Sequence, residues 1–403
     1  MLDPLLEAQG IGPTVFSEAL AADWAARRSE LAEQLRGARV LIVGAAGTIG
    51  SATARQLLAF SPARLELVDV DENGLARLAR DVRSRGEGAS VAIGFNALDF
   101  AGWPGLAFVE AAGPFDLVLN FAAVKHVRSE KNLFTLLHMI DVNVVRQQRF
   151  GAHLAERRLA RRHFVVSTDK AADPTSFMGA TKRLLEAAAF AACDRDGGPD
   201  ASAARFANVA YSSGSLLESF VQRYDAGQAL AAPKDTRRYF ISARDAARIC
   251  LLAQLTCPAG AVAVPRFEPA AGAVELADVA AAFLAARGRE AVFVATPAEA
   301  AARLAAGGTG YPVLLTERDT AGEKAIEVFR GEGERVEPLG LAALEAVRPA
   351  PIGPNALVSA LAELANCVAG DRPATEAELE AIIRGVIPSF RHVAGQARLD
   401  DRI

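Results

Sequence analysis

An aspartate and a lysine stand side by side shortly after an apolar run at residues 164–167, with Thr168 between the run and the pair. Asp169 offers a carboxyl group and Lys170 offers an amine, which together supply the acid and the base that an elimination reaction needs. Lys170 can act as a base only if its pKa is lowered, either by burial or by the nearby cations of Lys125 and Lys182. The alternative interpretation is a surface ion pair, since neighbouring residues point to opposite faces only while a strand lasts.

A second group of residues has the composition of a phosphate-binding turn. Residues 40–50 read Val-Leu-Ile-Val-Gly-Ala-Ala-Gly-Thr-Ile-Gly, an apolar strand that enters a glycine-rich turn and then a helical segment. Glycine lets the backbone approach a pyrophosphate, whose charge is held by N–H groups at the start of the helix. The spacing GxxGxxG differs from the GxGxxG of two-domain dehydrogenases. A tight turn without a ligand is the competing interpretation of the glycines alone.

A carboxylate ends the second apolar run of the chain. Asp69 stands 19 residues after Gly50, where a carboxylate accepts hydrogen bonds from the ribose hydroxyls of an adenosine. Its charge would repel a 2'-phosphate, which favours NAD over NADP. A solvated turn is the alternative, because acidic and polar residues follow Asp69 at once. The predicted NAD-binding residues of this region are Gly44, Gly47, Thr48, Ile49, Gly50 and Asp69.

Apolar runs alternate with helix-length amphipathic segments along the first half of the chain. This rhythm is typical of βαβ units, and it predicts an α/β fold with a Rossmann-type, doubly wound parallel sheet. A second αβ-like alternation predicts a smaller C-terminal α/β domain that binds substrate. The expected strands are 39–43, 65–70, 91–94, 117–121 and 164–167 in the first region, and 291–295 and 313–316 in the second.

The same patterns divide the chain into three regions. Residues 1–38 have helical spacing and form an N-terminal helical extension. Residues 39–258 form the NAD-binding domain with the catalytic segment, and residues 259–403 form mainly the substrate-binding and C-terminal region. Loops with Gly, Pro and Arg between residues 205 and 240 are expected to cover the sheet and to contribute to the substrate site. Residues 375–387 are expected to be helical.

Composition excludes several classes of partner. The formal net charge of -4 gives no basic field for nucleic acid or for an anionic membrane surface. No apolar run approaches the roughly 20 residues that cross a bilayer, and the N-terminus lacks a signal-peptide pattern, so we expect a cytoplasmic protein without a transmembrane segment. Four scattered cysteines without metal-ligand spacing predict reduced thiols and no metal site; they are Cys193, Cys250, Cys257 and Cys367.

Three later stretches resemble one family. Residues 120–127 read Asn-Phe-Ala-Ala-Val-Lys-His-Val, residues 167–183 read Ser-Thr-Asp-Lys-Ala-Ala-Asp-Pro-Thr-Ser-Phe-Met-Gly-Ala-Thr-Lys-Arg, and residues 205–215 read Arg-Phe-Ala-Asn-Val-Ala-Tyr-Ser-Ser-Gly-Ser. They closely resemble the bacterial polysaccharide-biosynthesis branch of the extended short-chain dehydrogenases, which contains the UDP-N-acetylglucosamine 4,6-dehydratases. The resemblance spans residues 38–330, and the stretch from Ser167 through Lys182 is its most specific part.

The resemblance implies the 4,6-dehydration of a nucleotide-diphosphate sugar. Bound NAD+ oxidises carbon 4, water leaves from carbons 5 and 6, and the same cofactor returns the hydride to carbon 6. In this scheme Asp169 is the acid and Lys170 is the base. Thr168 hydrogen-bonds the carbon 4 oxygen, and Lys182 binds the nicotinamide ribose. The remaining cofactor-binding residues are Ala122, Ala123 and Ser167.

Met178 stands where the tyrosine of a Tyr-x-x-x-Lys motif would be. A thioether cannot take a proton, so Asp169 or a bound water must accept the proton of the carbon 4 hydroxyl. A subset of the 4,6-dehydratases carries methionine at this point, which favours that subset over the reductases. Core packing is the usual role of methionine, and it is compatible with a position beside the substrate.

Other matching positions concern the substrate, and three departures limit the resemblance. Asn143 is expected to order the backbone of the site, and His126 to pack against its neighbours rather than to act as an acid or a base. The predicted substrate-binding residues are Lys125, His126, Asn208, Ser215 and Arg238. The departures are Phe95-Asn96 in place of an acidic residue near adenine, and Ser213 and Thr320 in place of two arginines. The missing arginines leave UDP, GDP and CMP open as the nucleotide.

Two other functions remain open at this point. The first is an epimerase or reductase on the same scaffold, and net hydride transfer to external NAD(P)H would support it. The second is a catalytically silent NAD-binding scaffold protein, for which the methionine is the best argument and the retained Thr168, Asp169, Lys170 and Lys182 are the counter-argument. The resemblance also implies a homo-oligomer, of a size that the sequence leaves open together with the sugar substituents and the stereochemistry at carbon 5.

Overall fold

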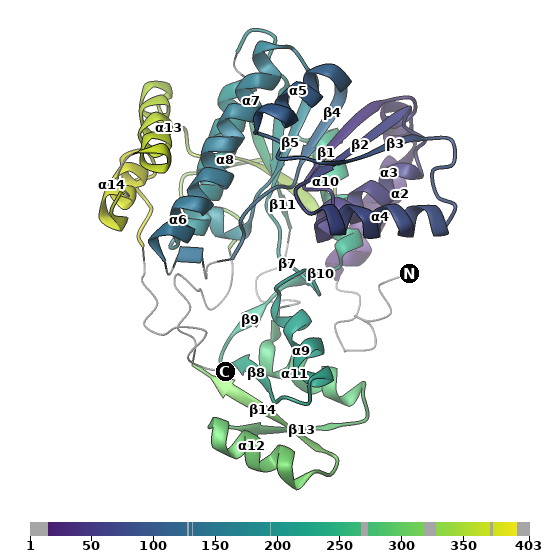
Figure 1. The fold of residues 1–403 in the computed structure, drawn as a ribbon, viewed down its shortest axis with the longest axis vertical. Helices are drawn as coiled ribbons and strands as arrows, with labels where there is room; N and C mark the ends of the chain where they lie inside the picture. The colour runs from purple at the N-terminus through teal and green to yellow at the C-terminus, as the bar shows by residue number, and fades with distance from the viewer. Residues whose placement is uncertain are drawn as a thin grey trace.

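The computed structural model describes residues 15–126, 129–130, 132–193, 195–266, 273–317, 328–370 and 374–392. These residues form a larger α/β lobe and a smaller lobe that lies below it in Figure 1. Within the described ranges, no helix has both the length and the apolar character that crossing a membrane requires.

The larger lobe is built on a sheet that has nine strands in the described part of the chain. The strand order is β15-β16-β11-β6-β5-β4-β1-β2-β3. The strands from β11 to β3 run parallel, and β16 and β15 add antiparallel pairs at one edge. The predicted α/β class and doubly wound parallel sheet are therefore confirmed. The bounds are β1 Arg39–Val43, β2 Arg64–Asp69, β3 Ala92–Ala97, β4 Phe115–Asn120, β5 Ala160–Val166, β6 Asp200–Ala204, β11 Ala261–Pro265, β15 Arg335–Pro338 and β16 Leu344–Arg348.

Helices cover both faces of this sheet because alternate strand residues point to opposite faces. Val40 and Ile42 are buried with side chains of α2, α3, α4 and α10. Leu41 and Val43 are buried on the other face with side chains of α5 and α7. The predicted N-terminal helix is present as α2. The helices are α2 Val15–Leu35, α3 Thr48–Leu58, α4 Glu72–Ser84, α5 Trp103–Ala112, α6 Leu133–Ile140, α7 Arg146–Glu156, α8 Phe177–Cys193 and α10 Ala243–Thr256.

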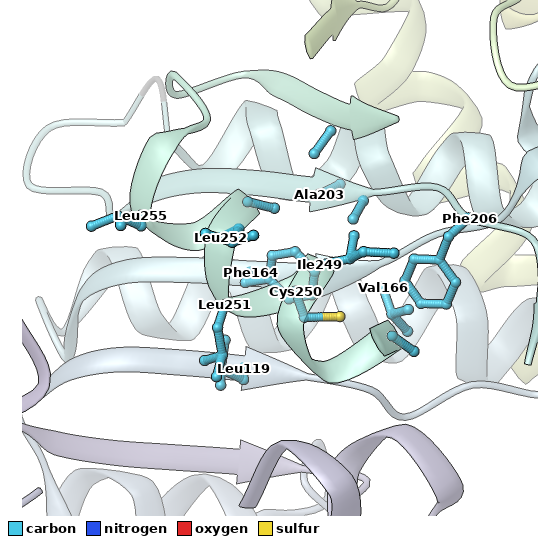
Figure 2. Close-up of a cluster of buried hydrophobic side chains, with 14 of the residues drawn as sticks. Leu119, Phe164, Val166, Ala203, Phe206, Ile249, Cys250, Leu251, Leu252 and Leu255 are labelled. Carbon is cyan, nitrogen blue, oxygen red and sulfur yellow. The ribbon is translucent and has the colours of Figure 1, made fainter. Parts of the chain in front are cut away.

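Helix α10 lies on the central strands and fixes one side of the core. Figure 2 shows Ile249, Cys250 and Leu252 of α10 together with Phe164 and Val166 of β5. Burial raises the pKa of the Cys250 thiol far above its usual range. This cysteine is therefore a neutral core residue, which agrees with the prediction of reduced core thiols.

The smaller lobe has its own three-stranded parallel sheet, in the order β13-β14-β8. Phe220, Leu230, Phe283 and Val313 are buried in its core. Two short strand pairs are formed by β7 with β10 and by β9 with β12, and Figure 1 shows β7 and β10 between the two lobes. The bounds are β7 Asn208–Val209, α9 Leu216–Asp225, β8 Leu230–Pro233, β9 Arg237–Arg238, β10 Phe240–Ile241, β12 Val274–Glu275, α11 Leu276–Ala285, β13 Glu290–Val294, α12 Pro297–Ala306 and β14 Gly310–Thr316.

The lobes do not follow the division that we predicted at residues 258 and 259. Strands β11, β16 and β15 come from residues 259–403 but extend the larger sheet, whereas β8 and α9 come from residues 205–240 and build the smaller lobe. The alternation after residue 260 therefore supplies strands to both sheets. The reason is that hydrophobic periodicity identifies a strand without identifying the sheet that it joins.

A C-terminal helical hairpin covers the side of the larger lobe formed by α6 and α8 (Figure 1). It consists of α13 Pro354–Ala369 and α14 Glu376–Val386, and α14 confirms the helix predicted at residues 375–387. Leu364, Leu379 and Ile383 are buried against side chains of α6 and α8. The rings of Phe177, in α8, and Phe390, which follows α14, lie 5.4 Å apart, so the segment after the hairpin supports the start of the helix that carries Met178 and Lys182.

Candidate active site

The glycine-rich turn joins β1 to α3, and its glycines have different roles. Gly44 has a φ of +75°, and a Cβ at this position would lie 2.7 Å from the backbone nitrogen of Ala122. A Cβ at Gly50 would lie 2.2 Å from the carbonyl oxygen of Gly44. A Cβ at Gly47 would meet only that same oxygen, at 3.4 Å. Gly44 and Gly50 are therefore needed by the packing of the turn itself, whereas Gly47 leaves open space beside it.

The start of α3 can bind an anion through its backbone N–H groups. Gly47 is the N-cap residue, and no side chain caps this end. The N–H groups of the first helical turn, which includes the predicted Thr48 and Ile49, have no partner inside a helix and carry a partial positive charge. The Thr48 hydroxyl oxygen accepts a hydrogen bond from the backbone N–H of Ser213 at 3.3 Å, which joins this turn to the smaller lobe.

Asp69 lies at the end of β2 and belongs to the same turn. Its Oδ2 accepts a hydrogen bond from the Ala46 N–H at 2.9 Å, and its Oδ1 accepts one from the Asp71 N–H at 2.9 Å. Each carboxylate oxygen has a second lone pair, so the group can still accept hydrogen bonds from a ribose. Asn96, which stands at a departure from the family pattern, donates to the buried Glu66 at 2.8 Å.

Side chains from the end of β4 and from the α6–α7 region hold the loop after β4. Asn120 Oδ1 accepts from the Ala122 N–H at 3.0 Å, and Gln147 Nε2 donates to the Ala122 carbonyl at 2.9 Å. Asn143 accepts from the Val124 N–H at 2.9 Å and donates to the Val124 carbonyl at 2.8 Å. The segment with the predicted Ala122 and Ala123 is thereby fixed against the glycine turn. Asn143 orders this backbone as expected.

The catalytic segment begins where β5 ends. Thr168 Oγ1 donates to Asp169 Oδ1 at 2.6 Å, and the backbone N–H of Lys170 donates to the same oxygen at 2.9 Å. Lys170 Nζ lies 3.2 Å from Oδ1. The Asp169 side chain is only 3% exposed and that of Lys170 is 24% exposed. The pair is therefore a buried carboxylate that meets a partly exposed amine, which differs from the surface ion pair considered as the alternative.

Met178 and Lys182 lie one helical turn apart at the start of α8. Met178 is 4% exposed, and its N–H donates to Glu130 Oε1 at 2.8 Å. Lys182 is 3% exposed, and its Nζ donates to the Val166 carbonyl at 2.8 Å. The Ser167 hydroxyl donates to Glu186 at 2.5 Å, so the polar group of this predicted cofactor residue points into the protein. Lys182 is thus held at the end of β5, beside the catalytic segment.

Burial lowers the pKa of Lys182 from 10.5 to about 8, and the Glu186 carboxylate opposes this shift. Between these two pH values Lys182 holds a proton in the unfolded chain but not in the folded one, so its own contribution to the free energy of unfolding rises with pH, by at most about 1.4 kcal/mol per pH unit. In urea unfolding at a series of pH values, we expect the free energy of unfolding of the wild type to rise with pH relative to that of Lys182→Met. The surface residue Lys234 provides the control, because Lys234→Met should follow the wild type over this pH range. Parallel curves for the wild type and Lys182→Met would contradict the prediction.

The predicted substrate side is assembled from the loop after β4 and the start of α9. A Cβ at Gly214 would lie 2.5 Å from the ring of His126, so this ring packs on the turn before α9. Burial lowers the pKa of Lys125, and the Glu218 carboxylate opposes the shift. Ser215 accepts from the Glu218 N–H at 3.3 Å, and Glu218 accepts from the Gly214 N–H at 2.6 Å. The structure therefore brings Lys125, His126 and Ser215 together.

Asn208 and Arg238 lie in the short strands β7 and β9. The Asn208 side chain donates to the Tyr239 carbonyl at 3.5 Å. Arg238 is 6% exposed, and its Nη1 donates to the Arg237 carbonyl at 2.8 Å. Thr320 and the Gly-Glu-Lys at 322–324 lie outside the described residues. Within the described ranges, no group of three or more His, Cys, Asp or Glu side chains could hold a metal ion.

Several residues of the site were not predicted from the sequence. Glu218 forms a capping pair with Ser215, and the spacing Ser-x-x-Glu is a known sign of a helix start. Gln147 stands four residues after Asn143 and Glu186 four residues after Lys182, on the same helix faces. These spacings could have identified the three residues as candidate members of the site. The residues that they contact elsewhere in the chain could not be predicted from the sequence.

Comparison with known proteins assigns the family. The family described as "Polysaccharide biosynthesis protein" matches residues 40–327. The chain belongs to this family. This match covers β1, the glycine turn, the catalytic segment and α9, and thus the residues from which the site has been built.

Two curated relatives match the chain over only part of their own length. The capsular polysaccharide biosynthesis protein CapD of Staphylococcus aureus is 27% identical over 242 residues, which are 58% of this chain and 39% of CapD. The uncharacterized membrane protein MJ1061 of Methanocaldococcus jannaschii is 30% identical over 218 residues, which are 53% of this chain and 62% of MJ1061. The chain thus spans less than two thirds of either relative.

Solved structures share the fold at low sequence identity. Pen from Bacillus thuringiensis has a TM-score of 0.61 and 20% identity, with coverage of 79% of this chain and 89% of Pen. The epimerase Mth375 from Methanothermobacter thermautotrophicus has a TM-score of 0.56 and 14% identity, with coverage of 75% of this chain and 86% of Mth375. These similarities support the Rossmann-type fold.

Proposed function

We propose that the chain is an NAD-dependent nucleotide-sugar 4,6-dehydratase that forms a 4-keto-6-deoxy sugar nucleotide for surface polysaccharide biosynthesis. The observation that carries the proposal is the buried Asp169 carboxylate with the Lys170 amine 3.2 Å away, beside a methionine in the usual position of a tyrosine. An acid and a base are thus present where the hydroxyl of a reductase or epimerase is missing.

The residues around the glycine turn fit NAD. Gly47 leaves room for a pyrophosphate, the uncapped start of α3 offers N–H groups to its charge, and Asp69 can accept from the ribose hydroxyls. When bound, the cofactor supplies a hydride acceptor for carbon 4 and a hydride donor for carbon 6. A structure of the UDP-glucuronic acid 4-epimerase of Bacillus cereus contains NAD, which agrees with this use of the fold.

Gly47→Ala tests the cofactor site. The added methyl group meets only one protein atom at 3.4 Å, so the turn should fold, but the group fills the space beside the pyrophosphate. We expect NAD+ binding to weaken about tenfold or more, about 1.4 kcal/mol, in a calorimetric titration with an unchanged circular dichroism spectrum. The matched variant Gly50→Ala should instead destabilise the fold, because its methyl group would lie 2.2 Å from Gly44 O. Equal NAD+ affinity in Gly47→Ala and wild type would exclude this pyrophosphate site.

The proton transfers follow from the contacts of Asp169. The reaction requires Asp169 as a carboxylate and Lys170 as a neutral amine at its start. The carboxylate 3.2 Å from Lys170 Nζ favours the charged amine, so Lys170 must release its proton before the reaction begins. Thr168 donates to Asp169 and can accept from the carbon 4 hydroxyl, so the proton of that hydroxyl passes through Thr168 to Asp169 as carbon 4 loses its hydride. The resulting ketone acidifies the proton on carbon 5.

The elimination of water and the addition of hydride at carbon 6 then return Asp169 and Lys170 to their starting protonation states. Lys170 removes the carbon 5 proton, and the protonated Asp169 delivers its proton to the carbon 6 hydroxyl, which leaves as water. Hydride addition at carbon 6 is accompanied by proton return from Lys170 to carbon 5. One water is lost, and Asp169 and Lys170 regain their starting charges.

The diagnostic experiment is mass spectrometry of the protein with a panel of sugar nucleotides and no added cofactor. The panel contains UDP-, GDP-, CMP- and TDP-linked hexoses and N-acetylhexosamines, in water and in D2O. We expect one donor to lose one water, and its product to gain one deuterium at carbon 5 in D2O. A donor with deuterium at carbon 4 should transfer this deuterium to carbon 6 of the same molecule.

Other outcomes identify the competing functions. An unchanged mass with a changed sugar configuration would show an epimerase. A product with two added hydrogens, formed only with external NAD(P)H, would show a reductase. Tight NAD binding with no product from any donor would overturn the dehydratase proposal for these donors in favour of a silent binder.

A further inference from the structure

Three buried charged residues, Arg205, Glu186 and Glu334, form a cluster next to the catalytic segment. The Arg205 side chain has no exposed surface. Its Nε and Nη2 donate to Glu186 at 2.8 and 2.7 Å, and its Nη1 and Nη2 donate to Glu334 at 2.7 and 2.8 Å. Two carboxylates thus share one guanidinium in a geometry of paired hydrogen bonds. Buried charges of this kind are costly unless every partner is present.

One end of the cluster contacts the strand end that carries the catalytic residues. The Ser167 hydroxyl donates to Glu186 Oε1 at 2.5 Å, and Ser167 directly precedes Thr168 and Asp169. Arg183 supports the same carboxylate from 3.9 Å. Any movement of Glu186 therefore acts on the residue next to the catalytic segment.

The other end of the cluster belongs to residues 329–334, far along the chain. Arg205 Nη1 also donates to the Phe329 carbonyl at 3.3 Å, and Glu334 accepts from the Gly331 N–H at 2.8 Å. The backbone N–H of Glu332 donates to both oxygens of Asp173, at 3.0 and 3.2 Å. Residues 329–334 thus contact the chain on both sides of the catalytic residues in the sequence. They contact Asp173, which follows Lys170, and through Arg205 and Glu186 they reach Ser167, which precedes Thr168.

We infer that Glu334 and Arg205 are positioning residues, which hold Ser167 through Glu186 and so fix the segment Thr168–Lys170 that acts on the substrate. The action on substrate rests on the proposed function, whereas the position of the segment can be measured without any substrate. A fully paired polar network specifies one arrangement of the groups it joins. Removal of one partner at residue 334 should therefore loosen the segment at the far end.

Glu334→Gln is the informative variant because it keeps the shape of the side chain, removes its charge and replaces one of its two acceptor oxygens by an NH2 donor. Glu337→Gln is the matched control, since Glu337 lies in β15 three residues later and pairs with Arg348 at 2.9 Å on the surface. We expect amide hydrogen exchange in a peptide covering residues 167–173 to rise about tenfold or more in Glu334→Gln. Glu337→Gln should leave that peptide unchanged.

A second variant tests the route through Ser167. Ser167→Ala should raise amide hydrogen exchange in the same peptide. Adding Glu334→Gln to this variant should have little further effect, because the hydrogen bond between Ser167 and Glu186 is already lost. Fully additive effects, or exchange that rises only at residues 329–338, would overturn the inference. Unfolding of Glu334→Gln as a whole would show a purely structural role and would also overturn it.

A kinetic readout separates this inference from the proposed function. With a turned-over nucleotide sugar, Glu334→Gln should lower kcat about tenfold or more with KM changed less than about twofold, because the variant disturbs the reacting groups and leaves the binding groups in place. A change in KM alone would contradict the positioning role. If no donor is turned over, the proposed function fails, and the exchange experiment still decides the inference.

Discussion

Asp169→Asn is expected to lower kcat for dehydration by about 10²–10⁴-fold, the usual contribution of a general acid or base. Asparagine keeps the shape of the side chain and can still accept from the Thr168 hydroxyl and the Lys170 N–H. It cannot take the proton of the carbon 4 hydroxyl or deliver one to the leaving hydroxyl. Both proton transfers therefore lose their carrier, whereas NAD+ affinity should stay the same. Single-turnover product formation, followed by mass spectrometry, measures the effect.

The matched control for Asp169→Asn is Asp196→Asn. Asp196 is also an aspartate paired with a cation, Arg158 at 3.0 Å, but its side chain is 96% exposed. Its replacement should leave kcat unchanged. If Asp169→Asn retained activity within about threefold of wild type, a bound water would have to be the acceptor and Asp169 would lose its role.

Arg205→Met is expected to have the largest effect on stability. It removes the guanidinium that the buried carboxylates of Glu186 and Glu334 share and leaves Glu186 only the more distant Arg183, at 3.9 Å. Breaking a buried pair in this way costs about 3–5 kcal/mol. Urea unfolding without cofactor measures the loss. The unpaired carboxylates should also have raised pKa values in the folded variant, so the folded state binds more protons. The deficit should therefore shrink as the pH falls and grow as it rises.

Arg348→Met provides the comparison for Arg205→Met. Arg348 pairs with Glu337 at a similar distance of 2.9 Å, but the two side chains are 32% and 39% exposed. Its replacement should cost about 1 kcal/mol or less. Equal losses in the two variants would show that water reaches the Arg205 cluster and solvates its carboxylates.

Sequence patterns predicted those parts of the fold that depend on interactions between residues close together in the chain. An apolar strand, a glycine turn and a carboxylate at fixed spacing identified β1, α3 and the end of β2, because each signal arises from neighbouring residues. The assignment of β11, β16 and β15 to the larger sheet could not be predicted in this way. Strand pairing depends on contacts between residues far apart in the chain, and the apolar patterns of the two sheets are alike.

The same distinction holds for the candidate site. Thr168, Asp169 and Lys170 could be proposed because they are adjacent and follow a strand. The buried pairing of Arg205 could not, since Glu334 is 129 residues away in the sequence, and an arginine in a loop has no pattern that indicates burial. Ser167 shows the limit most directly, because the family resemblance implied a cofactor contact for it, whereas no sequence pattern indicated that its hydroxyl donates to Glu186.

The strand order has a consequence for the nascent chain on the ribosome. Strand β6 pairs with β11, which follows only after α9, β8 and α10 have been made, and Arg205 meets Glu334 later still. Until then β6 is an open sheet edge that can pair with another chain, and Arg205 is a cation without its second carboxylate. The amino-terminal two thirds of the chain should therefore depend on chaperones during synthesis. The larger lobe can close only when the residues around Glu334 have left the exit tunnel.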